Sequence, residues 1–414
     1  MRQENERGKG LRPPITPPRA SLDAVLGFAW DAGVFVSDDV MSATGLTRTT
    51  TIDALDELID AGLLRELPNA RAAGEYRKGR PARRFELRAD AAVVIGMDAG
   101  RAHLTTTVAD LAGRTLATDT VGLDVTHDGA PDRRAAILTA IDATLAAAGT
   151  ARGGVLAVCV GVPAPVDSLG RSPEHRDDFW RRMNPDIAAM LGEWVPIVRI
   201  DNDASLAAVA EGSVGSAVGL DNYVVLLAGD RLGAGVVVDG HLLRGTHGGV
   251  GEMVAFDHVA GVESANGLGT QLTDWVRAAV ASGDVPAGHP LYSLSPDELT
   301  GRAALELARS GDAWAQSIVE RGGVLMSRIA GVFGSLYDPS RIIVAGAVAE
   351  GLDGVLDAAR AHVRDDLDLP APELVISALG STSVVTGAVS AAIVAARSGV
   401  LHLGDESPHL ARTG

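Results

Sequence analysis

A stretch rich in glycine, residues 232–252 (LGAGVVVDGHLLRGTHGGVGE), constrains the fold of this chain more than any other feature. Gly233 and Gly235 permit a close backbone approach that a Cβ would block, which favours a turn beside a ligand. Asp239-Gly240 is a hairpin turn signal between two short apolar runs. The later glycines leave Glu252 on an irregular loop, where a carboxylate can accept hydrogen bonds from hydroxyl groups. The stretch therefore predicts one wall of a ligand pocket, with an ordinary glycine-rich hairpin as the alternative.

Charge is distributed unevenly along the 414 residues. The formal net charge of −17 argues against a protein whose whole surface binds nucleic acid. Residues 1–88 contain 14 Lys and Arg and 13 Asp and Glu, so they carry a net charge of +1 and the remainder carries −18. The pattern predicts a separate N-terminal module attached to an acidic body, and the length leaves room for two or three domains.

Cysteine content and hydropathy indicate the cellular compartment in which the protein is expected. The one cysteine, Cys159, lies in the apolar run 155–160, so we expect a buried thiol and no disulfide framework. We find no uninterrupted apolar run long enough to span a bilayer, and the N-terminus has prolines and charges where a signal peptide has an apolar core. We therefore expect a cytoplasmic protein that does not contact a membrane.

Three helices and a strand hairpin are predicted in residues 21–88, after a flexible proline-rich tail over residues 1–20. Ser21, Ser37 and Thr47 can each cap a helix. Strands over 63–67 and 84–87 would flank a basic wing able to enter a minor groove. The alternative is a basic loop on a protein-interaction module. The residues expected to contact DNA are Thr47, Arg48, Thr49 and Thr50 at the start of the third helix and Arg77, Lys78, Gly79, Arg80 and Arg83 in the wing.

The body, residues 91–397, is predicted to contain two related α/β lobes with a cleft between them. A buried strand and a hairpin over residues 93–121 recur as the strands of residues 223–238. Helices are expected over 133–147 and between residues 270 and 337, and residues 398–414 are expected to form a second flexible tail. The apolar helix 314–336 is a candidate dimer interface, although ordinary core explains most of it.

The motif Asp201-Asn202-Asp203 follows the apolar strand 197–200 and opens a helix. Polar groups at the carboxyl end of a strand face the region where α/β proteins bind ligands. Asp203 can act as a general base on a sugar hydroxyl, but Asp201 or Asp203 can equally well cap the helix. The sequence by itself favours neither interpretation.

Two sets of motifs resemble the ROK family of sugar kinases and transcription regulators. LDELIDAGLL (residues 55–64) and Gly79-Arg80-Pro81-Ala82 resemble the winged helix-turn-helix of the family's regulators. The rest of the chain, up to about residue 396, resembles the kinase-like body of the same family. The resemblance implies an N-terminal winged helix-turn-helix followed by a two-lobed, actin-like (ribonuclease H-like) α/β body. It also implies that Asn202, Asp203, Glu252 and Glu263 contact sugar hydroxyls.

Departures from the family pattern predict that catalysis is lost. The family's Asp-x-Gly-Gly-Thr phosphate loop is Asp98-Ala99-Gly100-Arg101-Ala102 here, its Gly-Thr-Gly is Gly233-Ala234-Gly235, and a glycine pair is reduced to Ala345-Gly346-Ala347. Glu252-Met253-Val254-Ala255 has alanine in place of the family's zinc-binding histidine, and residues 256–261 contain no cysteine. His247 and His258 cannot supply a structural zinc site. We therefore expect no ATP, no metal and no other cofactor.

The combined prediction is a DNA-binding transcription regulator that represses sugar-related genes and is not an enzyme. Its expected partners are double-stranded operator DNA, a sugar or sugar-derived effector, and further copies of the chain in a homodimer or tetramer. The alternative is an ATP-dependent ROK sugar kinase with an appended DNA-binding module. A third possibility is a partner-binding protein whose body binds no ligand.

Overall fold

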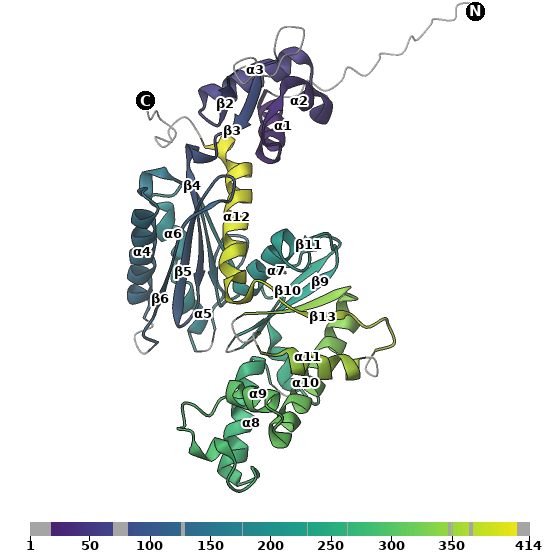
Figure 1. The fold of residues 1–414 in the computed structure, drawn as a ribbon. Helices are drawn as coiled ribbons and strands as arrows, with labels where there is room; N and C mark the ends of the chain where they lie inside the picture. The colour runs from purple at the N-terminus through teal and green to yellow at the C-terminus, as the bar shows by residue number, and fades with distance from the viewer. Residues whose placement is uncertain are drawn as a thin grey trace, which may run out of the picture. The chain divides into compact units, whose positions relative to one another are not determined.

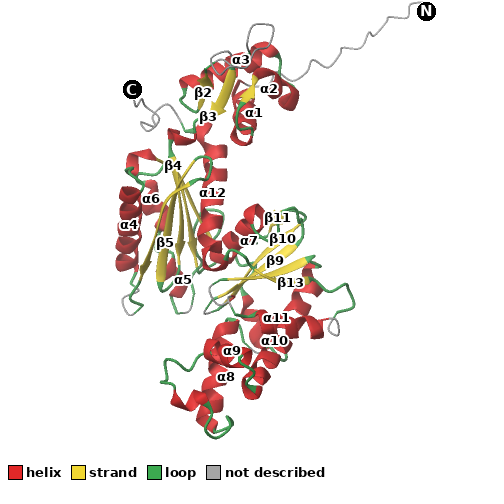
Figure 2. Cartoon of the chain, in the orientation of Figure 1, coloured by secondary structure: helices red, strands yellow, loops and turns green. Residues whose placement is uncertain are grey.

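The computed structural model describes residues 18–68, 82–125, 129–175, 177–229, 231–262, 264–346, 349, 351–363 and 367–403 (Figures 1 and 2). The chain divides into two compact units, Met1–Ala92 with Arg397–Gly414, and Val93–Ala396. The predicted wing-tip residues Arg77, Lys78, Gly79 and Arg80 lie outside the described residues, and so does Glu263.

The first unit contains three helices and a small antiparallel sheet. The helices are α1 (Pro18–Asp31), α2 (Ser37–Thr44) and α3 (Arg48–Asp60). The strands β1 (Phe35–Val36), β2 (Leu64–Leu67) and β3 (Arg84–Leu87) pair in the order β1-β3-β2. Leu55, Leu58 and Phe85 are fully buried between them. The predicted helices and hairpin are confirmed, whereas the two-residue strand β1 is too short to show a periodicity.

Helix ends in this unit differ in part from the predictions. Thr47 caps α3, because its Oγ1 accepts a hydrogen bond from the Thr50 amide at 3.3 Å. Ser21 does not cap α1 but is buried inside it. Helix α2 starts at Ser37, and the Val36 amide before it donates to the Asp39 carboxylate at 2.9 Å.

Residues 398–402, which the sequence analysis assigned to a flexible tail, are helical. Helix α12 (Ser383–Gly399) continues into a 3-10 helix, η8 (Val400–His402). Arg397 donates to the Gly27 carbonyl at 2.6 Å and pairs with Asp31 at 2.8 Å. These bonds attach Arg397, which belongs to the first unit, to α1.

The first lobe of the second unit is a five-stranded sheet in the order β6-β5-β4-β7-β8. Its strands are β4 (Val93–Ala99), β5 (His103–Asp110), β6 (Thr115–Gly122), β7 (Val155–Val162) and β8 (Ile197–Asn202). Helix α4 (Ala130–Ala147) covers one face and α12 the other (Figure 1). Two short helices that the sequence did not predict, α5 (Phe179–Met183) and α6 (Ile187–Gly192), precede β8. Cys159 is fully buried in β7, and burial raises the pKa of its thiol, as expected for a core residue.

The second lobe repeats this strand order. Its sheet runs β11-β10-β9-β12-β13, so both sheets have the order third, second, first, fourth, fifth along the chain. The strands are β9 (Tyr223–Ala228), β10 (Leu232–Val238), β11 (His241–Leu242), β12 (Arg341–Ala345) and β13 (Glu373–Ile376). The helices are α7 (Asp203–Val214), α8 (Leu268–Ser282), α9 (Gly301–Arg309), α10 (Ala313–Tyr337) and α11 (Asp353–His362). The predicted pair of related lobes is confirmed.

The predicted turn at Gly233 and Gly235 is wrong, because both residues lie within strand β10. A Cβ on Gly235 would collide with the Ala204 carbonyl oxygen and approach the Cβ of Ala208 to 2.5 Å, and one on Gly233 would lie 3.2 Å from the Cβ of Ala204. The two glycines therefore let helix α7 pack directly on the sheet. The Asp239-Gly240 turn is confirmed, with φ angles of 50° and 73° that suit a tight hairpin.

By length and composition the segment Gly380–His402 is apolar enough to cross a membrane, although Ser, Thr and Arg397 interrupt its apolar residues. In the structure 44% of its most apolar window is buried inside the protein. A Cβ on Gly96 of β4 or on Gly387 of α12 would collide with the backbone of Val389 or Leu206, respectively. Helix α12 thus packs closely on β4 and α7.

We predict that Gly235→Ala lowers stability by about 1 to 3 kcal/mol, because the added methyl group must displace helix α7 from β10. Gly192→Ala is the matched control, because a Cβ there meets no atom within 4 Å. The control should change stability by less than about 1 kcal/mol. Chemical denaturation of both variants tests the prediction, and equal stability of the two would contradict it.

Candidate functional site

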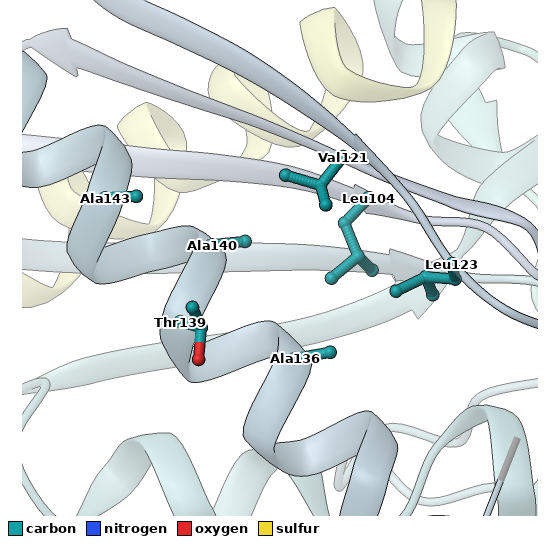
Figure 3. Close-up of a pocket in the computed structure, with 7 residues that line it drawn as sticks. All are labelled: Leu104, Val121, Leu123, Ala136, Thr139, Ala140 and Ala143. Carbon is teal, nitrogen blue, oxygen red and sulfur yellow. The ribbon is translucent and has the colours of Figure 1, made fainter. Parts of the chain in front are cut away.

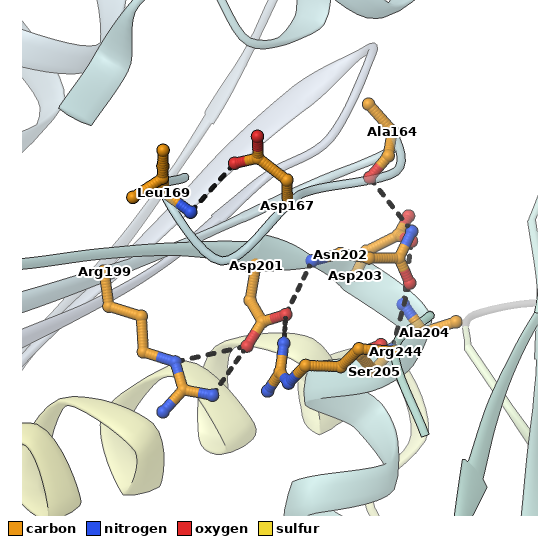
Figure 4. A network of polar contacts seen from close by, with 10 residues as sticks. All are labelled: Ala164, Asp167, Leu169, Arg199, Asp201, Asn202, Asp203, Ala204, Ser205 and Arg244. Atoms are coloured by element: carbon orange, nitrogen blue, oxygen red, sulfur yellow. Dashed lines mark hydrogen bonds and ion pairs between the residues drawn. The ribbon is translucent and has the colours of Figure 1, made fainter. Parts of the chain in front are cut away.

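Asp201 lies at the end of β8 and is neutralised by two arginines (Figure 4). Its side chain is only 1% exposed. Arg199 donates to one carboxylate oxygen at 2.9 Å, while Arg244 and the Asn202 amide donate to the other. With its oxygens occupied in this way, Asp201 has a structural function in the site.

Asn202 caps helix α7. Its Oδ1 accepts a hydrogen bond from the Ser205 amide at 3.0 Å, and its Nδ2 donates to the Ala164 carbonyl at 3.2 Å. The sequence had left Asp201 and Asp203 as candidates for the cap, and both assignments are wrong. The amide joins the start of α7 to the loop that follows β7, and it keeps one N–H for a further acceptor.

Asp203 is the first residue of α7 and is half-buried. One carboxylate oxygen accepts a hydrogen bond from the Ala204 amide at 2.7 Å. Burial, together with the nearby carboxylates of Asp98 and Glu252, raises the pKa of Asp203 to about 7. The structure therefore brings together three acidic side chains from β4, α7 and the loop after β11.

Glu252 ends the run of glycines, as predicted, and is half-buried. Its backbone pairs with Gly233 of β10 in an isolated bridge. Burial raises the pKa of the Glu252 carboxyl, whereas the nearby Arg231 and His175 side chains lower it. Carboxylates held in this way can accept hydrogen bonds from ligand hydroxyl groups.

The turn after β4 is filled by a histidine that the sequence analysis missed. The Nε2 of His103 lies 3.1 Å from the Asp98 carboxylate, and a Cβ on Gly100 would be only 2.7 Å from the His103 ring. The hydrogen bond to Asp98 raises the pKa of His103. Arg133, which is buried, donates to the carbonyls of Ala99 and Gly100. The five-residue separation of Asp98 and His103 around a hairpin turn was the signal that could have revealed the pair.

The loop after Glu252 is held by apolar and backbone contacts. Phe256 is buried and meets Phe333 of α10 edge-to-face, with ring centroids 6.0 Å apart. Asp257 accepts a hydrogen bond from the Ala265 amide at 2.8 Å. His247 and His258 are exposed. Within the described part of the chain, no group of three His, Cys, Asp or Glu residues is placed to hold a metal ion.

A cavity of about 250 Å³ lies elsewhere, in the first lobe between α4 and the β5–β6 hairpin (Figure 3). Its lining is apolar except for Thr139, and it contains none of the predicted ligand residues. The lining residues are Leu104, Val121, Leu123, Ala136, Thr139, Ala140 and Ala143.

The candidate DNA-contacting residues of the first unit fall into two groups. Thr47, Arg48 and Thr49 are exposed at the start of α3, and Thr50 shares a hydrogen bond with Thr47 between their hydroxyl groups at 2.9 Å. Arg83 instead pairs with Asp56 of α3 at 2.8 Å and with Glu66 of β2 at 2.9 Å. The guanidinium of Arg83 thus braces the sheet against α3, which leaves it less able to neutralise a phosphate.

Comparison with known sequences gives both enzymes and regulators as relatives. The chain is 28% identical over 222 residues to the bifunctional enzyme NanE/NanK of Brucella suis, and the match covers 51% of this chain and 39% of that protein. It therefore spans about two fifths of the length of that relative. It is 27% identical to the glucokinase of Streptomyces coelicolor (72% and 97% covered) and 22% identical to the DNA-binding transcriptional dual regulator NagC of Escherichia coli (75% and 74% covered).

Solved structures show the same fold. A ROK family transcriptional regulator, a homologue of the E. coli MLC protein, superposes with a TM-score of 0.73 at 21% identity and covers 93% of this chain and 98% of its own. A ROK family glucokinase from Streptomyces griseus, in complex with glucose and AMPPNP, gives a TM-score of 0.58 at 26% identity and covers 73% and 99%. The predicted winged helix-turn-helix followed by an actin-like α/β body is thus confirmed as the fold. The ROK family pattern matches residues 94–395, and the chain therefore belongs to the ROK family.

Proposed function

We propose that the protein is a DNA-binding transcription regulator that represses sugar-related genes, with a body that binds a sugar or sugar derivative without phosphorylating it. The observation that carries the proposal is the winged helix-turn-helix of the first unit, which exposes Thr47, Arg48 and Thr49 at the start of α3. The start of a recognition helix is the part that meets base edges in the major groove. The similarity to a ROK regulator over 93% of the chain supports the same function.

DNA recognition in this proposal divides between α3 and the wing. Thr47, Arg48, Thr49 and Thr50 contact bases and phosphates in the major groove. Wing residues 77–80 contact phosphates and the minor groove. Arg83 contributes to DNA binding only indirectly, because Asp56 and Glu66 hold its guanidinium. A homodimer would place two such units on a palindromic operator.

The effector in this proposal binds to Asn202, Asp203 and Glu252, with Glu263 as a further contact. His103 supports the non-catalytic assignment, because its ring packs against Gly100 where the family's phosphate loop has its glycines. Asp98, at the start of that loop, is occupied by the same ring at 3.1 Å. Sugar binding would then act by changing the relation between the two lobes, and with it the affinity of the oligomer for DNA.

One observation favours the alternative, an ATP-dependent sugar kinase. Asp203 has its pKa raised to about 7, and a general base is most effective when its pKa lies near the operating pH. A coupled assay with ATP and a panel of hexoses separates the two functions. The proposal expects no sugar-dependent ADP release, together with sugar-dependent release of operator DNA. ADP release that disappears in Asp203→Ala would establish the kinase instead.

We predict that Arg48→Ala weakens operator binding by about 1 to 3 kcal/mol and relaxes discrimination at one base position. Arg302→Ala is the matched control, because it removes the same charge from an exposed position on the body. Titrations against operator and scrambled duplexes at several salt concentrations test the prediction. If Arg48→Ala binds the operator as tightly as the control does, α3 is not the reading helix.

We predict that Asp203→Asn is more stable than the parent protein at pH 8, and that this advantage disappears towards about pH 4. Asp203 binds its proton more tightly in the folded than in the unfolded protein, so ionisation between about pH 4 and 7 destabilises the fold. Asparagine can keep the hydrogen bond from the Ala204 amide but cannot ionise. The gain at pH 8 should be on the order of 1 kcal/mol or more, after allowance for solvent screening. Thermal denaturation from pH 4 to 8 measures it, and a pH-independent difference would contradict the assignment.

A further inference from the structure

The loop that carries Glu252, residues 243–252, belongs to the second lobe but is fastened to the first lobe at two points. Arg244 pairs with Asp201 at the end of β8 (Figure 4). Gly248 is buried, has a φ of 71°, and lies so close to the loop after β7 that a Cβ would collide with the backbone of Val166. We call residues 243–252 the glycine-rich loop.

Asp201 receives two guanidinium groups whose structural roles differ. Arg199 donates twice to Oδ2, at 2.9 and 3.2 Å, but lies on β8, in the same strand as Asp201. Arg244 donates to Oδ1 and comes from the other lobe. Both arginines are about one-third exposed, so they bring equal charge to the same carboxylate from similar environments. Of these two arginines, only Arg244 joins the two lobes.

Both residues of the Arg244–Asp201 ion pair are connected to the candidate effector site through a few backbone atoms and hydrogen bonds. On one side, Asp201 is followed directly by Asn202 and Asp203. On the other, the Val250 amide donates to the Arg244 carbonyl at 3.2 Å, and the Glu252 amide donates to the Gly249 carbonyl at 3.2 Å. A shift of Arg244 therefore moves the loop that ends at Glu252.

We infer that the Arg244–Asp201 ion pair positions Glu252 relative to Asp203 and thereby sets the affinity for the effector. Arg244 and Asp201 are positioning residues, because the ligand contacts belong to Asn202, Asp203 and Glu252. A polyol that bridges Asp203 and Glu252 needs its two acceptors at a fixed separation, and a loosened loop must be ordered when the ligand binds. The effect on affinity rests on the proposed sugar-binding function, whereas the effect on the loop does not.

The test compares Arg244→Gln with Arg199→Gln, each of which removes one positive charge from beside Asp201. Native-state hydrogen exchange is measured at the Val250 and Glu252 amides of the full-length protein. We expect exchange to be about ten-fold faster in Arg244→Gln and unchanged in Arg199→Gln. Arg244→Lys keeps the charge but loses the planar fork, so it should fall between the parent and Arg244→Gln, and it serves as the test if the glutamine variant does not fold.

Calorimetry with glucose and with N-acetylglucosamine as probes measures the effect on binding. For the sugar that the parent protein binds, the Kd should rise about ten-fold in Arg244→Gln and less than about two-fold in Arg199→Gln. Equal effects of the two glutamine variants on exchange, or no effect of either, would overturn the inference. If the parent binds neither sugar, the proposed effector function loses its support, and hydrogen exchange still decides whether Arg244 fixes the loop.

Discussion

The close packing of helix α7 on strand β10 is the constraint on which the candidate site depends. Gly233 and Gly235 have no Cβ, so the first turn of α7 can lie against the strand at Ala204. Gly233 also forms an isolated antiparallel β-bridge with Glu252. One glycine thus contacts the neighbour of Asp203 on one side and Glu252 on the other, and this brings two carboxylates from distant parts of the chain close together. A Cβ on Gly235 would push α7 away from the sheet, and one on Gly233 would crowd Ala204.

The acidic residues of the site differ in how the surrounding protein compensates their charges. Asp201 is buried and receives two arginines, which offsets the cost of removing its charge from water. Asp98 is paired with His103. Asp203 accepts a hydrogen bond from the Ala204 amide, but burial and the carboxylates of Asp98 and Glu252 raise its pKa to about 7. Asp201, with its charge neutralised, thus joins the two lobes, whereas Asp203, which has no cationic partner of this kind, is the residue that we propose as a ligand contact.

Two arginines of the first unit are held in ion pairs with acidic residues of the same unit. Arg65 pairs with Glu86 across the β2–β3 hairpin, and Arg83 pairs with Glu66 and Asp56. The Arg83–Asp56 pair holds the hairpin against α3, and the other two pairs lie within the hairpin, so the guanidinium groups of Arg65 and Arg83 are partly occupied within the fold. Arg48, exposed in the first turn of α3, is better placed to contact DNA.

The sequence by itself determined most of the elements and the identities of the ligand candidates. Hydrophobic periodicity located the strands and long helices, because burial of one face repeats every two or every 3.6 residues. The Asp239-Gly240 turn and the Thr47 cap were also local, since each depends on conformations or bonds within four residues. Contacts between residues far apart in the chain were decided only by the tertiary structure. Gly235 proved to be a packing position because Ala204 and Ala208 lie over it. Asn202 is the cap because α7 begins at Asp203, whereas Asp201 still lies in β8 and receives Arg199 and, from 43 residues away, Arg244. No local pattern can specify which arginine reaches a buried carboxylate, because that choice depends on how two lobes pack.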